Sequence, residues 1–221
     1  MKGIRAFASI VAALSTATTP AAGTPDYWRL LPHYRPQVSD AACSVASVAM
    51  ALGALGVRGI DQPVLMAADA DWRLRAQTGG DGVSFAEMTT YLHRVLDRAG
   101  MADARLTVFH PAGMGADQLD RLRSLLRAAA DGTADVVLVS FDQGWLWGED
   151  SAGHVSPVGD YDAERGMVLI MDVDPAHFGP LWLPEQTLLA AMVRAGVADP
   201  DGVLVITRQG PPGQQLAAAP P

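Results

Sequence analysis

The chain has 221 residues, of which 49% are hydrophobic and 18% are charged, and its formal net charge is −8. This length and apolar content are enough for one domain with a sizeable core, and no linker-like segment divides the chain. The acidic balance argues against a nucleic-acid partner, because a phosphate backbone is bound by basic side chains.

Residues 1–23 have the pattern of an export signal. Lys2 and Arg5 are followed by the apolar run 6–14 and then by small residues around 21–23, where cleavage is expected. The run is too short to span a bilayer, so we expect a periplasmic or secreted protein without membrane contact after signal removal. That removal changes the formal charge from −8 to −10, since two basic residues and no acidic one are lost. The alternative is a disordered N-terminus without a targeting role.

Three helices are predicted in the next part of the chain. Apolar positions at helical spacing follow Cys43 and end at Gly56. A capping box of Ser84 and Glu87 opens a second helix, which runs to Gly100. The third helix is capped near Asp117 and ends before residue 131.

The second half of the chain changes to strands. Short apolar runs bounded by turn residues predict strands at 135–141, 167–172 and 202–207. Turn residues at 162–166 join the segment 153–161 to the strand at 167–172 as a hairpin.

A further helix is expected to begin at Pro184. Residues 209–221 are rich in Gln, Pro and Ala and are expected to form a disordered tail. Helices followed by mostly antiparallel strands predict an α+β fold of two lobes, with Cys43 on the helical lobe facing the sheet.

Cys43 is the only cysteine in the chain, so it cannot form an internal disulfide. One explanation is a buried small hydrophobic side chain. Its place at the start of a helix favours a nucleophile instead, because the helix dipole and unpaired N–H groups lower the pKa of a thiol. Gln37, six residues earlier, can donate its side-chain amide to an oxyanion.

A cysteine nucleophile needs a histidine to move protons and a third group to orient the imidazole. Among five histidines, only His154 begins a predicted strand, behind Gly153, which allows a close backbone approach. Asp172 ends the next strand of the hairpin, so the two side chains are expected to lie side by side. The other interpretation of Asp172 is a turn former at a strand end.

Several motifs accompany these residues along the chain. They are Gly82-Val-Ser-Phe85, Gly153-His-Val-Ser-Pro-Val-Gly-Asp-Tyr161, Asp162-Ala-Glu-Arg165, Leu169-Ile-Met-Asp172-Val173, Pro180-Leu-Trp182 and the segment 203–208. In this order, together with Gln37 and Cys43, they resemble the catalytic core of phytochelatin synthases over residues 26–208. The stretch from His154 to Arg165 is the most specific part, whereas the glutamine–cysteine spacing is shared by many papain-like enzymes.

The resemblance implies a papain-like fold, with an N-terminal helical lobe packed on a C-terminal antiparallel sheet, and a catalytic domain over 24–208. It implies that Cys43 attacks glutathione or a related γ-glutamyl peptide, releasing glycine and leaving a γ-glutamylcysteinyl thioester. His154 is then the acid and base, Asp172 orients the histidine and Gln37 is the oxyanion donor. The cysteine-rich extension of the plant members is lacking, so hydrolysis is expected to exceed phytochelatin synthesis.

The sequence departs from the family where arginines are usual. Gly144, Pro175 and Asp201 occupy those positions. A carboxylate at residue 201 repels a substrate carboxylate instead of pairing with it. Gly153 and Arg194 are the candidates for substrate binding, and the other interpretation of Arg194 is a surface residue at a helix end.

No cofactor and no protein metal site are expected, because the aspartates near Asp172 follow no calcium-loop spacing. The expected partner is glutathione, free or as a heavy-metal thiolate complex, since metals act on this family mainly through the substrate's thiolates. Two alternatives stay open: a papain-like peptidase that processes bacteriocin leaders, and a non-catalytic peptide-binding relative. The run from Ser156 to Arg165 favours the phytochelatin synthase family over the leader peptidases.

Overall fold

The structure of the protein is a computed structural model that describes residues 25–130, 135–177, 179–194 and 201–208. The expected signal at 1–23 and the expected tail at 209–221 lie outside these residues.

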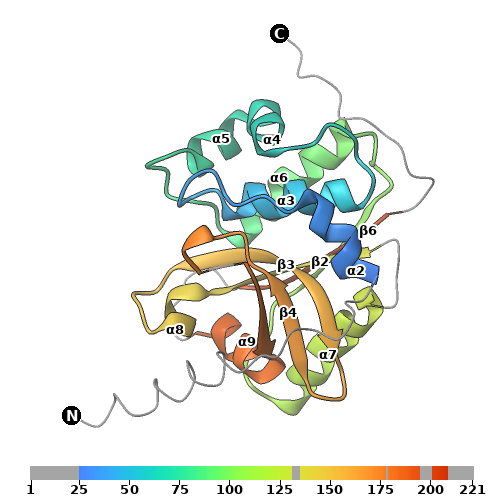
Figure 1. Cartoon of the computed structure of the whole chain (residues 1–221), viewed down its shortest axis with the longest axis vertical. Coiled ribbons are helices and arrows are strands. Elements are labelled where there is room, and N and C mark those ends of the chain that lie inside the picture. The colour runs from blue at the N-terminus through green and yellow to red at the C-terminus, as the bar shows by residue number, and fades with distance from the viewer. Residues whose placement is uncertain (1–24, 131–134, 178, 195–200, 209–221) are drawn as a thin grey trace.

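A six-stranded antiparallel sheet forms the centre of the molecule (Figure 1). Its strands follow the order β1-β6-β2-β3-β4-β5. They are β1 (Arg105–Phe109), β2 (Asp135–Asp142), β3 (Gly153–Asp162), β4 (Met167–Met171), β5 (Pro180–Pro184) and β6 (Gly202–Thr207). The predicted hairpin is confirmed, because β3 pairs antiparallel with β4 and the pairing ends at the turn that follows Asp162.

Helices cover both faces of this sheet. One face carries α2 (Pro25–Leu30), η1 (Leu31–His33), α3 (Cys43–Ala54), α4 (Gln62–Ala68), α5 (Ala70–Ala76) and α6 (Phe85–Arg98). The other carries α7 (Ala116–Ala130), α8 (Gln143–Trp147) and α9 (Glu185–Met192), and the short η2 (Pro175–His177) follows β4. No helix in the described ranges is long and apolar enough to cross a membrane.

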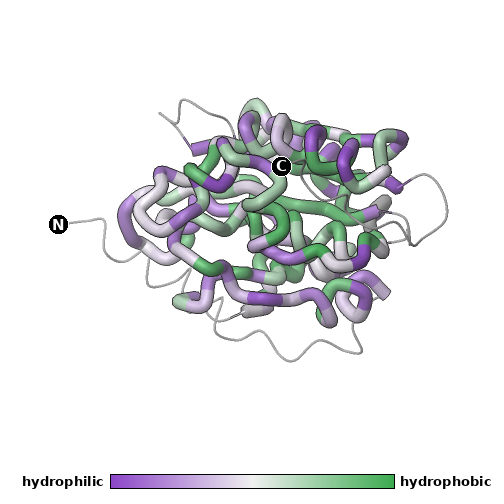
Figure 2. The backbone as a smooth tube through the Cα atoms, turned by 90° about the horizontal axis from the view of Figure 1, so that it is seen from above, coloured by the Kyte–Doolittle hydropathy of each residue, from purple (hydrophilic) through white to green (hydrophobic). Residues whose placement is uncertain are grey.

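The alternation of side chains along β2 explains this layering. Val136 and Leu138 join the core beneath α3 and α6, whereas Val137 and Val139 join the core beneath α7 and α9. Successive residues of a strand face opposite sides of the sheet, so one continuous apolar run supplies both layers. Figure 2 shows the hydrophobic segments gathered in the middle of the molecule. The α+β class is confirmed, and a second helical layer is added to the two expected lobes.

The predicted helix boundaries agree closely with the structure. The capping box at Ser84 is formed, since its hydroxyl accepts from the Glu87 amide and the Glu87 carboxylate accepts from the Ser84 amide. Helix α9 begins at Glu185, one residue after the predicted start at Pro184. Helix α7 begins at Ala116, one residue before the predicted cap at Asp117.

Helix α3 lies close against β3, and small residues make this possible. Residues 44–53 of the helix are all buried, and the Ser47 hydroxyl donates to the carbonyl of Val155 at 2.7 Å. Near the far end of the helix, a Cβ on Gly53 would lie 2.5 Å from the His33 ring. This packing fixes the N-terminus of α3, and with it Cys43, beside the start of β3.

Candidate active site

Cys43 is the first residue of α3 and lines a cavity of about 640 Å³. The residue as a whole is half-buried. The segment 79–85 and the ends of β2 and β3 form the other walls. A cavity of this size accommodates a small peptide, and Cys43 forms part of its wall.

His154 and Asp172 meet beside this thiol. His154 Nε2 lies 2.8 Å from Asp172 Oδ1, and both side chains are buried. The Ser156 hydroxyl lies 3.0 Å from the same ring nitrogen. Since His154 also forms a side-chain hydrogen bond with Cys43, Nδ1 is the ring nitrogen that remains for the sulfur. The expectation that His154 and Asp172 lie side by side is therefore confirmed.

The side chains of Cys43 and His154 shift each other's pKa. Burial disfavours the thiolate, but the hydrogen bond and charge of His154 outweigh it, and backbone hydrogen bonds from Val155 and Ser44 add to this, so the pKa of Cys43 lies below its ordinary value. Burial also disfavours the imidazolium, but Asp172 and the Cys43 thiolate together raise the pKa of His154 to about 10. Each shift favours the charged form of its group, so the contact favours a thiolate paired with an imidazolium.

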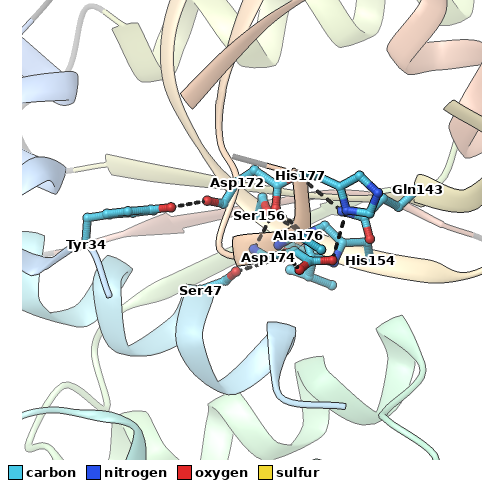
Figure 3. Close-up of polar contacts among 10 residues, drawn as sticks. Tyr34, Ser47, Gln143, His154, Ser156, Asp172, Asp174, Ala176 and His177 are labelled. Atoms are coloured by element: carbon cyan, nitrogen blue, oxygen red, sulfur yellow. Dashed lines mark hydrogen bonds and ion pairs between the residues drawn. The ribbon is translucent and has the colours of Figure 1, made fainter. Parts of the chain in front are cut away.

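Three further groups hold Asp172 in place (Figure 3). The Asp174 amide donates to Oδ1 at 2.9 Å, and the Gln143 side-chain amide donates to Oδ2 at 3.3 Å. The Tyr34 hydroxyl donates to the Asp172 carbonyl at 2.6 Å. With His154 on Oδ1, both carboxylate oxygens and the carbonyl have partners, so the carboxylate is held in one orientation toward the imidazole.

Sequence reasoning missed most of this support. Ser156 had a usable signal, because it lies two residues from His154 on one strand and therefore shares its face. Gln143 and Tyr34 had none, since they lie 29 and 138 residues from Asp172 and reach it only in the folded chain.

The structure places Gln37 next to the segment that carries Asp172. Its backbone N–H donates to the Val173 carbonyl at 2.8 Å. Its side-chain Oε1 is buried and has no hydrogen-bond partner among the described residues. Gln37 is not one of the described residues that line the cavity, so its role as an oxyanion donor stays a prediction.

The two substrate-binding candidates differ in position. Gly153 lines the cavity beside His154, and a Cβ there would meet no atom within 4 Å, so open space adjoins its backbone. Arg194 Nε lies 3.4 Å from Asp142 Oδ2, and its guanidinium lies over the Trp145 ring, 5.5 Å from the ring centre. Arg194 is outside the described lining, whereas its partner Asp142 is part of it.

The three positions without arginine have different physical settings. At Gly144 a Cβ would lie 1.7 Å from the Asp150 carbonyl oxygen, so the backbone of 143–152 leaves no room for a side chain. Pro175 is exposed at the start of η2. Asp201 lines the cavity and accepts a hydrogen bond from the Ser140 hydroxyl at 2.5 Å.

The cavity is strongly acidic. Its described lining contains four aspartates and neither lysine nor arginine: Asp40, Asp81, Asp142 and Asp201. Arg194 lies against one of them, and Arg75 lies 3.4 Å from another, the exposed Asp81. Carboxylates around a half-enclosed space produce a negative potential that attracts cations and repels anions.

The other histidines with described contacts are engaged elsewhere. His177 stacks on Trp147 and lies 3.0 Å from an Asp174 oxygen, and His110 lies 3.2 Å from the Asp201 carbonyl. Within the described ranges, no group of three or more His, Cys, Asp or Glu side chains is placed to hold a metal ion.

Comparisons with known proteins match most of the chain. A family model described as phytochelatin synthase matches residues 12–200. Glutathione gamma-glutamylcysteinyltransferase 1 of Lotus japonicus is 25% identical over 194 residues, covering 82% of this chain and 36% of that protein. The proteins of that name from Triticum aestivum and Arabidopsis thaliana are 26% and 24% identical over 176 residues, covering 75% of this chain and 32% and 33% of their own lengths. The chain thus spans about a third of the length of these relatives.

We expect the Cys43 thiol to react with iodoacetamide at pH values well below the ordinary thiol pKa of about 8.5, because His154 stabilises the thiolate. Changing His154→Ala removes the imidazolium, so the rate at pH 6 is expected to fall more than about tenfold while the rate at pH 10 changes little. The measurement is the alkylation rate from pH 5 to pH 10.

The control for this measurement is His93→Ala, which changes an exposed histidine of α6. This variant should keep the wild-type pH profile. A profile that is also unchanged in His154→Ala would contradict the ion pair.

Proposed function

Because the chain belongs to the phytochelatin synthase family, we propose that it is a cysteine acyltransferase and hydrolase acting on glutathione or a related γ-glutamyl peptide. The observation that carries this proposal is the continuous contact of Cys43, His154 and Asp172 at the wall of an open cavity. The relatives named as glutathione gamma-glutamylcysteinyltransferases support the choice of donor.

In the proposed reaction, the Cys43 thiolate attacks the carbonyl carbon of the Cys–Gly bond of the donor. The negative charge on the carbonyl oxygen is stabilised by the Gln37 amide. The tetrahedral intermediate then collapses, the C–N bond breaks, and His154 gives its proton to the departing amine of glycine. A γ-glutamylcysteinyl thioester remains on Cys43, and Asp172 keeps the imidazole in place throughout.

A second nucleophile resolves this thioester. Water, losing a proton to His154, releases γ-glutamylcysteine and regenerates the thiol, and the amine of a second glutathione gives a short phytochelatin by the same path. We propose that hydrolysis predominates. A free or heavy-metal-bound thiol peptide can serve as the donor, since the metal is then carried by the substrate and needs no site on the protein.

The acidic cavity bears on which donor is preferred. Glutathione carries two carboxylates, and neither meets an arginine or lysine in the described lining. We therefore propose that the cavity favours γ-glutamyl peptides whose C-terminal carboxylate is neutralised, as in an ester or amide. Asp40 repels glutathione more directly than Asp142 and Asp81, because Asp142 has Arg194 beside it and Asp81 has Arg75.

The guanidinium of Arg194 gives the donor's other end a partner. It is 37% exposed while it contacts Asp142, so some of its N–H groups face solvent. We propose that Arg194 binds the α-carboxylate of the γ-glutamyl group and that cavity aspartates bind the ammonium beside it. Gly153 leaves room for the donor's backbone near His154.

Two other functions fit parts of the same geometry. A leader-processing peptidase shares the cysteine, histidine and aspartate, and turnover of a double-glycine leader peptide in place of glutathione would favour it. A non-catalytic peptide-binding protein fits the missing arginines at 144, 175 and 201, but it has no need for a thiol whose pKa is lowered by His154.

For the whole chain we propose export to the periplasm or secretion, with 1–23 as the signal and 24–208 as the catalytic domain.

We expect an intact-mass spectrum to show a γ-glutamylcysteinyl adduct after wild-type protein is mixed with glutathione or its glycine ethyl ester. Cys43→Ala should give no adduct, and His154→Ala should slow glycine release by at least about a hundredfold with the fold retained. Glycine release that continues at the wild-type rate in either variant would overturn the mechanism.

We expect glutathione ethyl ester to have a higher kcat/KM than glutathione. Asp40→Asn should raise kcat/KM for glutathione about threefold or more, because one like charge is removed from the lining. Asp103→Asn, which changes an exposed aspartate outside the described lining, is the matched control and should have no effect. Equal kcat/KM for acid and ester in all variants would contradict the charge preference.

Arg194→Ala is expected to raise KM for γ-glutamyl donors about tenfold, because a charged hydrogen bond to the donor is lost. Arg194→Lys keeps the positive charge and should therefore have a KM between those of Arg194→Ala and the wild type. The control is Arg165→Ala, since that arginine is 77% exposed in the turn after β3. An unchanged KM in Arg194→Ala would exclude this role.

A further inference from the structure

The segment that carries Gln37 has no regular structure to hold it. Residues 34–37 lie between η1 and the turn that precedes α3, and they form neither helix nor strand. A donor that stabilises an oxyanion must be placed within a fraction of an ångström, so contacts from other elements have to position Gln37.

Gln62 supplies such contacts from helix α4. Its side-chain Nε2 donates to the Pro36 carbonyl at 2.8 Å, and its Oε1 accepts from the Val38 amide at 3.0 Å. One carboxamide therefore bridges the two residues that flank Gln37, as a neighbouring strand would. Gln62 is itself 4% exposed, which leaves its side chain little freedom to move.

The N-terminal end of helix α4, where Gln62 lies, is itself stabilised by a cap. Gln62 is the first residue of α4, and the Asp61 side chain caps this helix by accepting from the Val64 amide at 2.8 Å. On the opposite side, the Gln37 amide donates to the Val173 carbonyl, one residue after Asp172. The backbone of 36–38 is thus held between α4 and the segment that follows β4.

The side chain of Gln37 is left with an unused hydrogen-bonding group. Its Oε1 is buried without a partner among the described residues. A buried polar atom without a partner is costly, and the two ends of a glutamine amide are distinguished only by their partners. When the Gln37 amide is turned so that Nε2 takes the position of Oε1, Nε2 can donate a hydrogen bond to an oxygen of a bound ligand.

We propose that Gln62 is a positioning residue that acts through Gln37. It holds the backbone on both sides of the oxyanion donor, and it does not touch the substrate or the thiol. This inference rests on the proposed acyl-transfer chemistry, and it adds a residue that neither spacing nor family motif indicates.

The test compares Gln62→Met, which removes both hydrogen bonds and keeps the chain length, with Gln62→Glu, which keeps only the acceptor for Val38. Acylation is measured with a p-nitrophenyl ester, whose attack by Cys43 also forms an oxyanion, and thiol alkylation is measured with iodoacetamide, which forms none. We expect Gln62→Met to slow acylation by about ten- to a hundredfold while alkylation is unchanged, and Gln62→Glu to be less affected.

Each variant is also made in a Gln37→Ala background. If Gln62 acts through Gln37, Gln62→Met adds little to the loss already caused by Gln37→Ala. The matched control is Gln118→Met, because Gln118 likewise accepts from a backbone amide, that of Ala112, at 3.0 Å on the exposed start of α7.

Additive losses in the double variant would overturn the inference, and so would a parallel fall in alkylation, which indicates general damage to the site. The ester makes this test independent of the peptide donor. Coupling between Gln62 and Gln37 with no adduct from any γ-glutamyl donor refutes the proposed substrate alone, whereas γ-glutamyl turnover without coupling refutes this inference alone.

Discussion

The site depends on one contact, between the sulfur of Cys43 and the imidazole of His154, because these groups come from different layers of the molecule. The first belongs to the N-terminus of helix α3 and the second to the start of strand β3. They meet only because small buried residues let the helix lie against the strand, where Ser47 donates to the Val155 carbonyl. The shifted pKa values of both groups follow from this approach.

The other residues proposed for catalysis are tied to each other as well as to the core. The segment 172–174 orients the imidazole through Asp172 and receives the amide of Gln37 at Val173. Tyr34, three residues before Gln37, donates to the carbonyl of Asp172. The histidine orienter and the expected oxyanion donor are therefore parts of one hydrogen-bonded unit, and a displacement of either segment disturbs both.

The features that could be predicted from the sequence are those with short-range patterns along the chain. The hairpin of β3 and β4 has a turn of only a few residues, so the proximity of His154 and Asp172 follows from its geometry. The capping box at Ser84 is likewise complete within four residues. The helix start at Cys43 and the amide of Gln37 suggested a nucleophile and an oxyanion donor, and the family motifs then supported these two roles.

The rest depends on contacts between distant parts of the chain. Strand β1 is placed by its pairing with β6, about a hundred residues later, so its isolated pattern is weak. The apolar run of β2 does not reveal which helices cover each face. Gln62 and Gln143 carry no distinguishing neighbours in the sequence, and their importance arises only from the atoms that the fold brings to them.

The close approach at Gly144 has a consequence for protein engineering. Its backbone lies so near the Asp150 carbonyl that even a methyl group collides there. A single substitution cannot therefore install the family's usual arginine at this place. A side chain at residue 144 requires a different backbone path for the loop between β2 and β3, because the loop itself fills the space that the side chain would need.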